Sequence, residues 1–204
     1  MTDVAPTSVD GRPLSRRGLD TRRRLLDAAE QCFTELGYHD ASIVKITEAA
    51  GVAQGTFYLY FASKKEIFDE LVLDLNARVR HYVNERAQQG GTRVEQELRG
   101  FRAFFEFTAE HPALYRVIRQ AEFVSPATLE QHYERFGARY AEGLRKAMDE
   151  GELPPADPEI LTWALMGIAE LIGIRTILWS KDGRISDADF EALTTVIRRT
   201  LGAA

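Results

Sequence analysis

Apolar residues recur at helical spacing along almost the whole chain, and this periodicity constrains the fold more than any other feature of the sequence. Across residues 25–36, apolar side chains return every three or four positions, which places them on one face of a helix. The same spacing occurs across residues 67–83 and 190–201. No stretch alternates apolar and polar residues for long enough to form a β-strand. The sequence therefore predicts an all-α fold of about nine helices.

Capping residues and glycines predict where the N-terminal helices begin and end. Ser42 is a favourable N-cap for a short second helix, and Gly51 can adopt the positive φ that ends it. A third helix is expected over residues 54–61, and a capping-box pattern opens a long helix over residues 63–88. Two short helices separated by residues 51–53 and braced by a first helix have the spacing of a helix-turn-helix.

The net charge of −5, from 26 Lys and Arg against 31 Asp and Glu, would by itself argue weakly against a nucleic-acid partner. The charges are unevenly distributed, however, because residues 1–65 hold nine basic and eight acidic side chains while the rest of the chain is acidic. Residues 12–24 contain six arginines and one aspartate. On charge alone this segment is typical of a solvated tail. Beside a helix-turn-helix it is also a candidate for contacts with phosphates or the minor groove.

Small, apolar and aromatic residues stand at fixed positions around the predicted helix-turn-helix. They are Ala28, Ala29, Phe33, Gly37, Tyr38, Ile46, Ala49, Ala50, Gly51, Val52, Gly55, Thr56, Phe57, Tyr58, Tyr60, Phe61, Ser63, Lys64 and Ile67. With these residues, the segment from about residue 22 to residue 71 resembles the DNA-binding domain of TetR-family transcriptional regulators. Two positions depart from the family pattern: Ala53 replaces a frequent Ser or Thr cap, and Thr47 replaces a usual alanine.

The resemblance implies a DNA-binding surface around the third helix. Gln54, Thr56 and Tyr58 would face DNA, and Gly55 would permit a close approach, while Phe57 and Phe61 would pack in the domain core. The remaining candidates would contact phosphates from the neighbouring helices and the arginine-rich segment. The predicted DNA-binding residues are Ser42, Lys45, Gln54, Gly55, Thr56, Tyr58, Tyr60, Lys64, Arg16 and Arg17.

The resemblance and the charge distribution together predict three segments. Residues 1–18 would be a flexible basic arm, and residues 19–65 would form the helix-turn-helix DNA-binding domain. Residues 66–204 would form a larger helical domain for effector binding and dimerisation. Two identical heads on a palindromic operator require a dimer, with recognition helices about 34–36 Å apart.

The last two helices are the predicted interface of a homodimer. Residues 160–178 form the most apolar stretch, but Glu170 and Arg175 within it favour a buried helix over a membrane span. Small residues in this stretch would allow another helix to approach closely, and the helix that follows carries its own apolar stripe. The alternative is that both helices only complete the core of one subunit.

The middle of the chain is rich in aromatic residues, and the resemblance implies a pocket for an apolar effector there. A plain core is the alternative for any aromatic stripe at helical spacing. A buried Glu170 needs a partner, which would be a ligand, Arg175 or Arg119. The predicted effector-binding residues are Phe101, Phe105, Tyr115, Arg119, Glu122, Tyr133, Phe136, Tyr140, Trp163, Met166 and Glu170.

Other features argue against an enzyme, a metal site, a cofactor or a secreted protein. The chain has one cysteine, so no internal disulfide is possible and a reducing, cytoplasmic location is expected. Acidic residues precede any apolar run at the N-terminus, which argues against a signal peptide. The sequence lacks the motifs of serine hydrolases, zinc proteases, P-loop proteins and dinucleotide-binding folds.

The predicted function is that of a cytoplasmic, ligand-responsive repressor that binds a palindromic DNA operator as a homodimer. A small, largely apolar effector would favour a state with a different head spacing and release the operator, with the helix over residues 63–88 connecting the two parts. The alternative is a helical dimeric interaction module, or a regulator without any small-molecule ligand.

Overall fold

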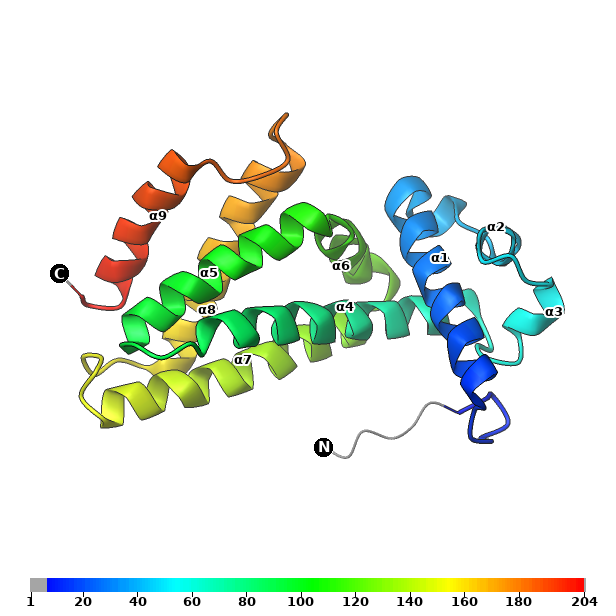
Figure 1. The fold of residues 1–204 in the computed structure, drawn as a ribbon, viewed down its shortest axis with the longest axis horizontal. Helices are drawn as coiled ribbons and strands as arrows, with labels where there is room; N and C mark the ends of the chain where they lie inside the picture. The colour runs from blue at the N-terminus through cyan, green and yellow to red at the C-terminus, as the bar shows by residue number, and fades with distance from the viewer. Residues whose placement is uncertain (1–6, 204) are drawn as a thin grey trace. The chain divides into compact units, whose positions relative to one another are not determined.

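The structure, a computed structural model, describes residues 7–203 and is built of helices joined by short connections (Figure 1). Within these residues there are nine α-helices, one π-helical segment and no β-strand, with an isolated bridge between Thr7 and Pro13. The predicted all-α fold is confirmed. Residues 1–6 of the predicted basic arm lie outside the described residues.

The chain divides into two compact units that interleave along the sequence. One unit contains the N-terminal residues up to Asp74 together with Arg116–Leu129, and the other contains Leu75–Tyr115 and the residues from Glu130 onward. The helices are α1 (Arg16–Asp40), α2 (Ile43–Ala49), α3 (Gln54–Phe57), α4 (Lys64–Ala87), α5 (Arg93–Glu110), α6 (Ala113–Val124), α7 (Pro126–Asp149), α8 (Pro158–Gly173), the π-helix η1 (Ile174–Leu178) and α9 (Asp187–Thr200).

An aromatic core holds the first unit together. Phe33 from α1 and Phe68 from α4 meet edge to face at 5.2 Å between ring centroids, and both side chains are fully buried. Phe57 and Phe61, on either side of the turn after α3, are also fully buried, with ring centroids 5.6 Å apart. Full burial of each such side chain contributes about 1.5–3 kcal/mol to stability. The first pair therefore stabilises the packing of α1 against α4, and the second stabilises the α3 segment.

The segment 116–129 is attached to the end of α1 through one glutamine. Gly37 has a φ of +78°, which interrupts the helical backbone where the sequence predicts the helix to stop. The amide oxygen of Gln120 accepts a hydrogen bond from Tyr38 N at 2.5 Å, and its Nε2 donates to Phe33 O at 3.1 Å. Gln120 therefore satisfies backbone groups that the interrupted helix leaves unpaired.

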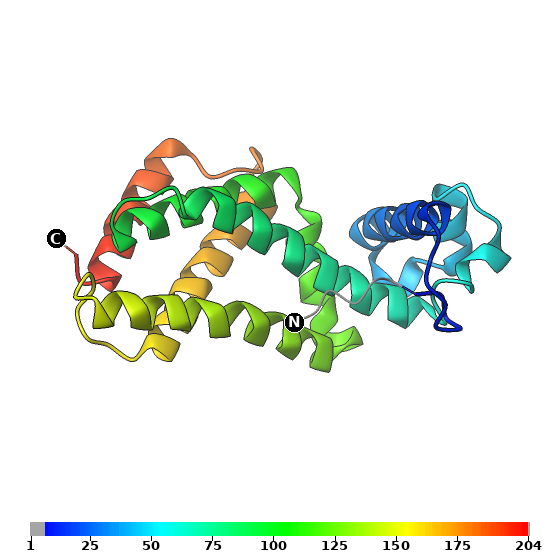
Figure 2. The same cartoon turned by 60° about the horizontal axis from the view of Figure 1, so that its bottom comes forward.

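The core of the second unit lies among α5, α7, α8 and α9. Each of these four helices contributes a side chain that is at most 1% exposed, namely Phe105, Leu144, Leu165 and Ile197, respectively. Figure 2 shows α8 running between α7 and α5. The apolar stripes predicted for these helices therefore meet in a single cluster.

Helix α8 differs from the continuous buried helix that the sequence predicts. One of its faces is open, with Ile160, Trp163 and Leu171 exposed by 69%, 51% and 63%. The helix also changes to η1 at Ile174, where Trp179 N donates to Ile174 O across five residues at 3.3 Å. By length and composition alone Pro158–Leu178 could cross a membrane, but the opposite face of the same helix packs in the core described above.

Candidate DNA-binding site and effector region

A tight turn joins α2 to a very short α3. Ser42 caps α2 as predicted, its hydroxyl accepting from Lys45 N at 3.2 Å, and Gly51 turns the chain with a φ of +63°. Helix α3 is shorter than the predicted 54–61, because the backbone after Phe57 turns with the 3₁₀-type bonds from Leu59 N to Thr56 O and from Tyr60 N to Phe57 O. Its cap residue Ala53 offers no side-chain acceptor.

The α3 segment separates polar from apolar side chains. Gln54, Gly55 and Tyr58 are exposed, and Thr56 and Tyr60 are half-buried. The two phenylalanines between and after them are fully buried, as the sequence predicts. The predicted base-reading residues are therefore held at the surface by the burial of their neighbours.

Gly55 is not required by any packing within the chain. A Cβ atom added at this position would meet no atom within 4 Å, and the residue has no positive φ. A glycine inside a helix costs about 1 kcal/mol relative to alanine. The fold therefore gains nothing from this glycine, whose surface is open to a partner outside the chain.

The N-terminal segment before α1 is tied to the chain that follows α3. Val9 N donates to Leu59 O at 3.1 Å, and the bridge between Thr7 and Pro13 closes a turn around Gly11. The sequence carries no clear signal for this contact. It places the start of the arginine-rich segment next to the α3 turn.

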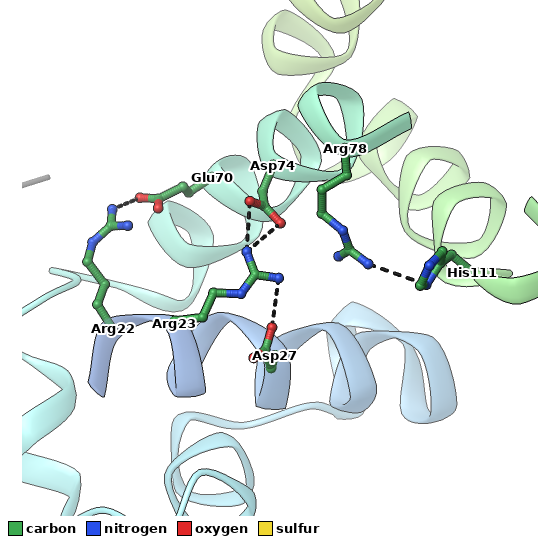
Figure 3. A network of polar contacts seen from close by, with 7 residues as sticks. All are labelled: Arg22, Arg23, Asp27, Glu70, Asp74, Arg78 and His111. Atoms are coloured by element: carbon green, nitrogen blue, oxygen red, sulfur yellow. Dashed lines mark hydrogen bonds and ion pairs between the residues drawn. The ribbon is translucent and has the colours of Figure 1, made fainter. Parts of the chain in front are cut away.

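The arginines of this segment fall into two groups, one of which is shown in Figure 3. Arg22 forms an ion pair with Glu70 of α4, and Arg23 bonds Asp74 at 3.0 Å. Arg23 also pairs with Asp27 at 2.8 Å, and Arg24 donates to the carbonyls of Ala50 and Gly51. The expectation that residues 22–24 are available for phosphates is wrong in this respect, because acceptors within the unit already use their guanidinium groups.

Arg16 and Arg17 form the second group. Both are exposed at the start of α1, and neither guanidinium makes an ion pair or hydrogen bond with the described residues. Burial raises the pKa of Glu70, an effect opposed by Arg22. The ion pairs with α4 thus engage Arg22 and Arg23 within the unit, whereas Arg16 and Arg17, like the exposed Arg12, are open to a partner.

The two predicted phosphate-binding lysines both bond backbone carbonyls. Lys64 Nζ donates to Tyr38 O and Ala41 O, each at 2.7 Å, and lies 4.3 Å from the centroid of the Tyr38 ring. Burial lowers the pKa of Lys64. Lys45 Nζ donates to Asp40 O at 3.1 Å. Both ammonium groups tie down the end of α1, a role that the sequence does not predict, and their phosphate contacts stay a prediction.

The predicted effector-binding residues do not form one group. Phe101 and Phe105 lie in the core of the second unit, and Tyr115 packs against Ile174 and Ile177 in a separate cluster. Phe136 and Met166 are partly buried and Trp163 is exposed on α8, whereas Arg119 and Glu122 are exposed residues of α6 in the first unit.

Glu170 has a partner that the sequence does not suggest. The hydroxyl of Tyr133 donates to its carboxylate, with 2.9 Å to each oxygen. The Tyr133 ring in turn lies 5.9 Å from that of Trp163. The tyrosine therefore satisfies the carboxylate in place of Arg119 or Arg175.

Glu97 is a second buried carboxylate, which the sequence does not predict. Glu97 accepts from Tyr140 Oη and from Arg93 Nε, the latter at 2.7 Å, and it is 7% exposed. Burial raises the pKa of Tyr140 and Glu97 raises it further. The i, i+4 spacing of Arg93 and Glu97 is the only signal of this cluster in the sequence. Tyr140 is thus engaged with a charged neighbour.

Asn76 and His132 join α4 to α7 inside the second unit. Asn76 Nδ2 lies 3.0 Å from His132 Nδ1 and donates to His132 O at 3.0 Å, and both side chains are buried. Burial lowers the pKa of His132 to about 4. The imidazole is therefore neutral at physiological pH. No group of three or more His, Cys, Asp or Glu within residues 7–203 is arranged to hold a metal ion.

The helix-turn-helix matches a known family. A family model described as bacterial regulatory proteins, tetR family, matches residues 25–71. The chain is also 35% identical over 108 residues to YdgC of Bacillus subtilis (strain 168), an HTH-type transcriptional regulator. Residues 25–71 therefore form a helix-turn-helix domain of the TetR family.

Comparisons that extend beyond residues 25–71 are more distant. The match with YdgC covers 51% of this chain and 55% of YdgC, about half the length of that relative. The HTH-type transcriptional activator FasR of Mycolicibacterium smegmatis is 33% identical over 138 residues, covering 61% of this chain and 62% of FasR. A crystal structure of FadR from Bacillus subtilis in complex with stearoyl-CoA has a TM-score of 0.74 at 22% identity, covering 89% of this chain and 98% of FadR. The likeness to FadR concerns the fold.

The buried neutral His132 predicts a loss of stability as the pH falls. Its pKa is about 4 in the folded protein and 6.5 when unperturbed. Between these values the unfolded chain binds more protons than the folded one, so the free energy of unfolding decreases with falling pH, by about 2 kcal/mol at pH 5. Urea unfolding at neutral pH and at pH 5 measures this decrease.

The variant His132→Gln should lack that part of the pH dependence. His81→Gln is the matched control, because it removes an imidazole whose side chain is 77% exposed. The same pH dependence in wild type and His132→Gln would contradict the assignment.

Proposed function

We propose that the chain is a DNA-binding transcriptional regulator, acting as a repressor in the cytoplasm and recognising a palindromic operator as a homodimer. The observation that carries the proposal is the α3 surface, where polar side chains stand exposed over two buried phenylalanines beside a glycine that the fold does not need. Short polar residues at the start of such a helix suit the edges of bases in the major groove. The free guanidinium groups of Arg16 and Arg17 suit phosphates.

The substitution Gly55→Ala separates DNA binding from stability. The unfolding temperature should stay the same or rise, because alanine favours the helix by about 1 kcal/mol and its Cβ has room. Operator affinity should fall about tenfold, because the Cβ would stand between the helix and the base edges. Fragments selected from genomic DNA and titrated by fluorescence anisotropy provide the measurement.

Gln54→Ala should likewise weaken binding to the selected operator, with Gln31→Ala of α1 as the matched control. Both glutamines are exposed, so neither change should unfold the protein. Full operator affinity in both Gly55→Ala and Gln54→Ala would remove the α3 surface as the DNA-binding site. Failure of the parent protein to select any fragment would favour the alternative, a helical interaction module.

The homodimer is proposed to form through α8 and α9. The open face of α8 carries Ile160, Trp163 and Leu171, and Val196 of α9 is 49% exposed. Gly167 lies on the same open face, and an added Cβ there would meet no atom within 4 Å. Exposed apolar surface and an unrequired glycine support close packing against a second helix.

The substitution Leu171→Glu should convert the dimer into a monomer, because it would bury a charge at the interface. Phe123→Glu is the matched control, since Phe123 of α6 is 82% exposed. Sedimentation equilibrium gives the mass of each variant. The monomer should also bind a full palindrome more weakly than the control does. A wild-type protein that sediments as a monomer at micromolar concentration would contradict the proposed interface.

The effector is proposed to be a small, largely apolar molecule, with acyl-coenzyme A thioesters as the first class to test. Support comes from the fold shared with FadR, which was solved in complex with stearoyl-CoA. Phe136, Met166 and Trp163 are the better candidates for apolar contacts, because they are not committed to the core as Phe101 and Phe105 are. Helix α4 begins in the first unit and ends in the second, which supports its role as the connection.

Palmitoyl-coenzyme A should lower operator affinity by about 5–150-fold, the usual range of coupling between two sites. Anisotropy titrations of the operator with and without the ligand measure the change, and decanol serves as a control for unspecific apolar binding. Unchanged operator affinity with acyl-coenzyme A and with a wider panel of apolar ligands would favour the alternative of an effector-independent regulator. FasR is named as an activator, so reporter assays that reveal activation would correct the proposed sign of regulation.

A further inference from the structure

Three arginines gather on α4 and α7 within the second unit. Arg80 lies one helical turn after Asn76 in α4, and Arg135 and Arg139 follow His132 in α7 by three and seven residues. Asn76 bonds both the ring and the carbonyl of His132 at 3.0 Å, so α4 and α7 are in contact at this level. The next turn of each helix therefore brings the arginines toward one another.

These arginines lack the carboxylate partners that other arginines in the chain possess. Among residues 7–203, Arg80 forms one hydrogen bond, to Asn76 Oδ1 at 3.4 Å, and neither Arg135 nor Arg139 forms an ion pair. By contrast, Arg93 of the same unit pairs with the buried Glu97. Arg80, Arg135 and Arg139 are thus three basic side chains without an ion pair among the described residues, in a chain whose net charge is negative.

The environment of Arg80 supports this conclusion. Burial lowers the pKa of Arg80, and Arg139 and Arg135 lower it further, with no carboxylate acting in the opposite direction. Like charges at this range destabilise the unliganded protein. An anion between them would remove the repulsion, and guanidinium groups offer paired N–H donors that match the oxygens of a phosphate.

Apolar side chains accompany this cluster on α7. Phe136 lies between Arg135 and Arg139 in sequence and is partly buried, and its ring centroid is 6.3 Å from that of Tyr140. A ligand with a phosphorylated head and an apolar chain would thus find both kinds of contact along one helix.

We propose that Arg80, Arg135 and Arg139 form an anion site that binds the phosphate groups of an amphipathic effector. The proposal rests on the proposed function in taking the ligand to be the effector, and it adds which chemical group is recognised and by which residues. A phosphate on a coenzyme and a phosphate on a lipid would present the same chemistry to the three guanidinium groups. A fatty acid carries a single carboxylate and would use this site much less.

Isothermal titration of the full-length protein with four probes tests the site: palmitoyl-coenzyme A, coenzyme A, lysophosphatidic acid and palmitate. The variants are Arg80→Gln and the double variant Arg135→Gln/Arg139→Gln. Arg145→Gln is the matched control, because Arg145 is an exposed arginine of α7 outside the cluster. Arg139→Gln alone serves as a further variant, since its exposed side chain is not needed for folding.

We expect the Kd for palmitoyl-coenzyme A to rise about tenfold or more in Arg80→Gln and in the double variant. Arg145→Gln should stay within about twofold of wild type, and the affinity should fall with rising salt. Binding of coenzyme A alone would identify the coenzyme as the source of the phosphate, and binding of lysophosphatidic acid alone would identify a lipid. Without ligand, the double variant should unfold at the same temperature as wild type or higher, because a repulsion has been removed.

Three outcomes would overturn the anion site. They are equal palmitoyl-coenzyme A affinity in wild type and the double variant, no binding of any phosphorylated probe to wild type, and a loss of operator affinity in the ligand-free double variant, which would assign the arginines to DNA. Arginine-dependent ligand binding without any change in operator affinity would leave the anion site in place and overturn only the effector control. The two proposals therefore fail separately.

Discussion

The burial of Phe57 and Phe61 is the interaction on which the head of this protein depends. A four-residue helix has no stability of its own, because helix nucleation is unfavourable and α3 lacks a side-chain cap. The two phenylalanines are fully buried and in ring contact with each other, which holds the segment on the unit. The polar side chains between the two phenylalanines consequently lie at the surface of the unit. The proposed DNA-binding surface therefore depends on packing far more than on helix propensity.

The arginines of the molecule fall into two classes, those that form ion pairs within the chain and those that do not. Arg22 and Arg23 are neutralised by α4, and Arg93 is neutralised within α5, so these residues stabilise the units. Arg16 and Arg17 of the first unit form no ion pair with the described residues, and the same holds for Arg80, Arg135 and Arg139 of the second. The acidic net charge of −5 therefore coexists with two local basic surfaces, one suited to DNA and one to a smaller anion.

Two helix glycines that no packing within the chain requires lie on the surfaces proposed to contact partners. Gly55 and Gly167 lie on exposed helix faces where a methyl group would have room. Each costs helix stability, and each lies on a surface proposed to meet a partner, DNA in one case and a second subunit in the other. The open apolar face of α8 fits the same interpretation, because a fully intramolecular core would have covered Leu171 and Ile160.

The sequence by itself determined the helical class, the helix-turn-helix and most helix boundaries, because periodicity, caps and glycines act over a few neighbouring residues. It also placed Phe57 and Phe61 in the core. Only the tertiary structure decided that α3 spans a single turn, that Lys64 bonds the end of α1, and that Glu170 pairs with Tyr133. Such pairings join residues tens of positions apart. They depend on the distances and burial that packing creates, which no local pattern in the sequence encodes.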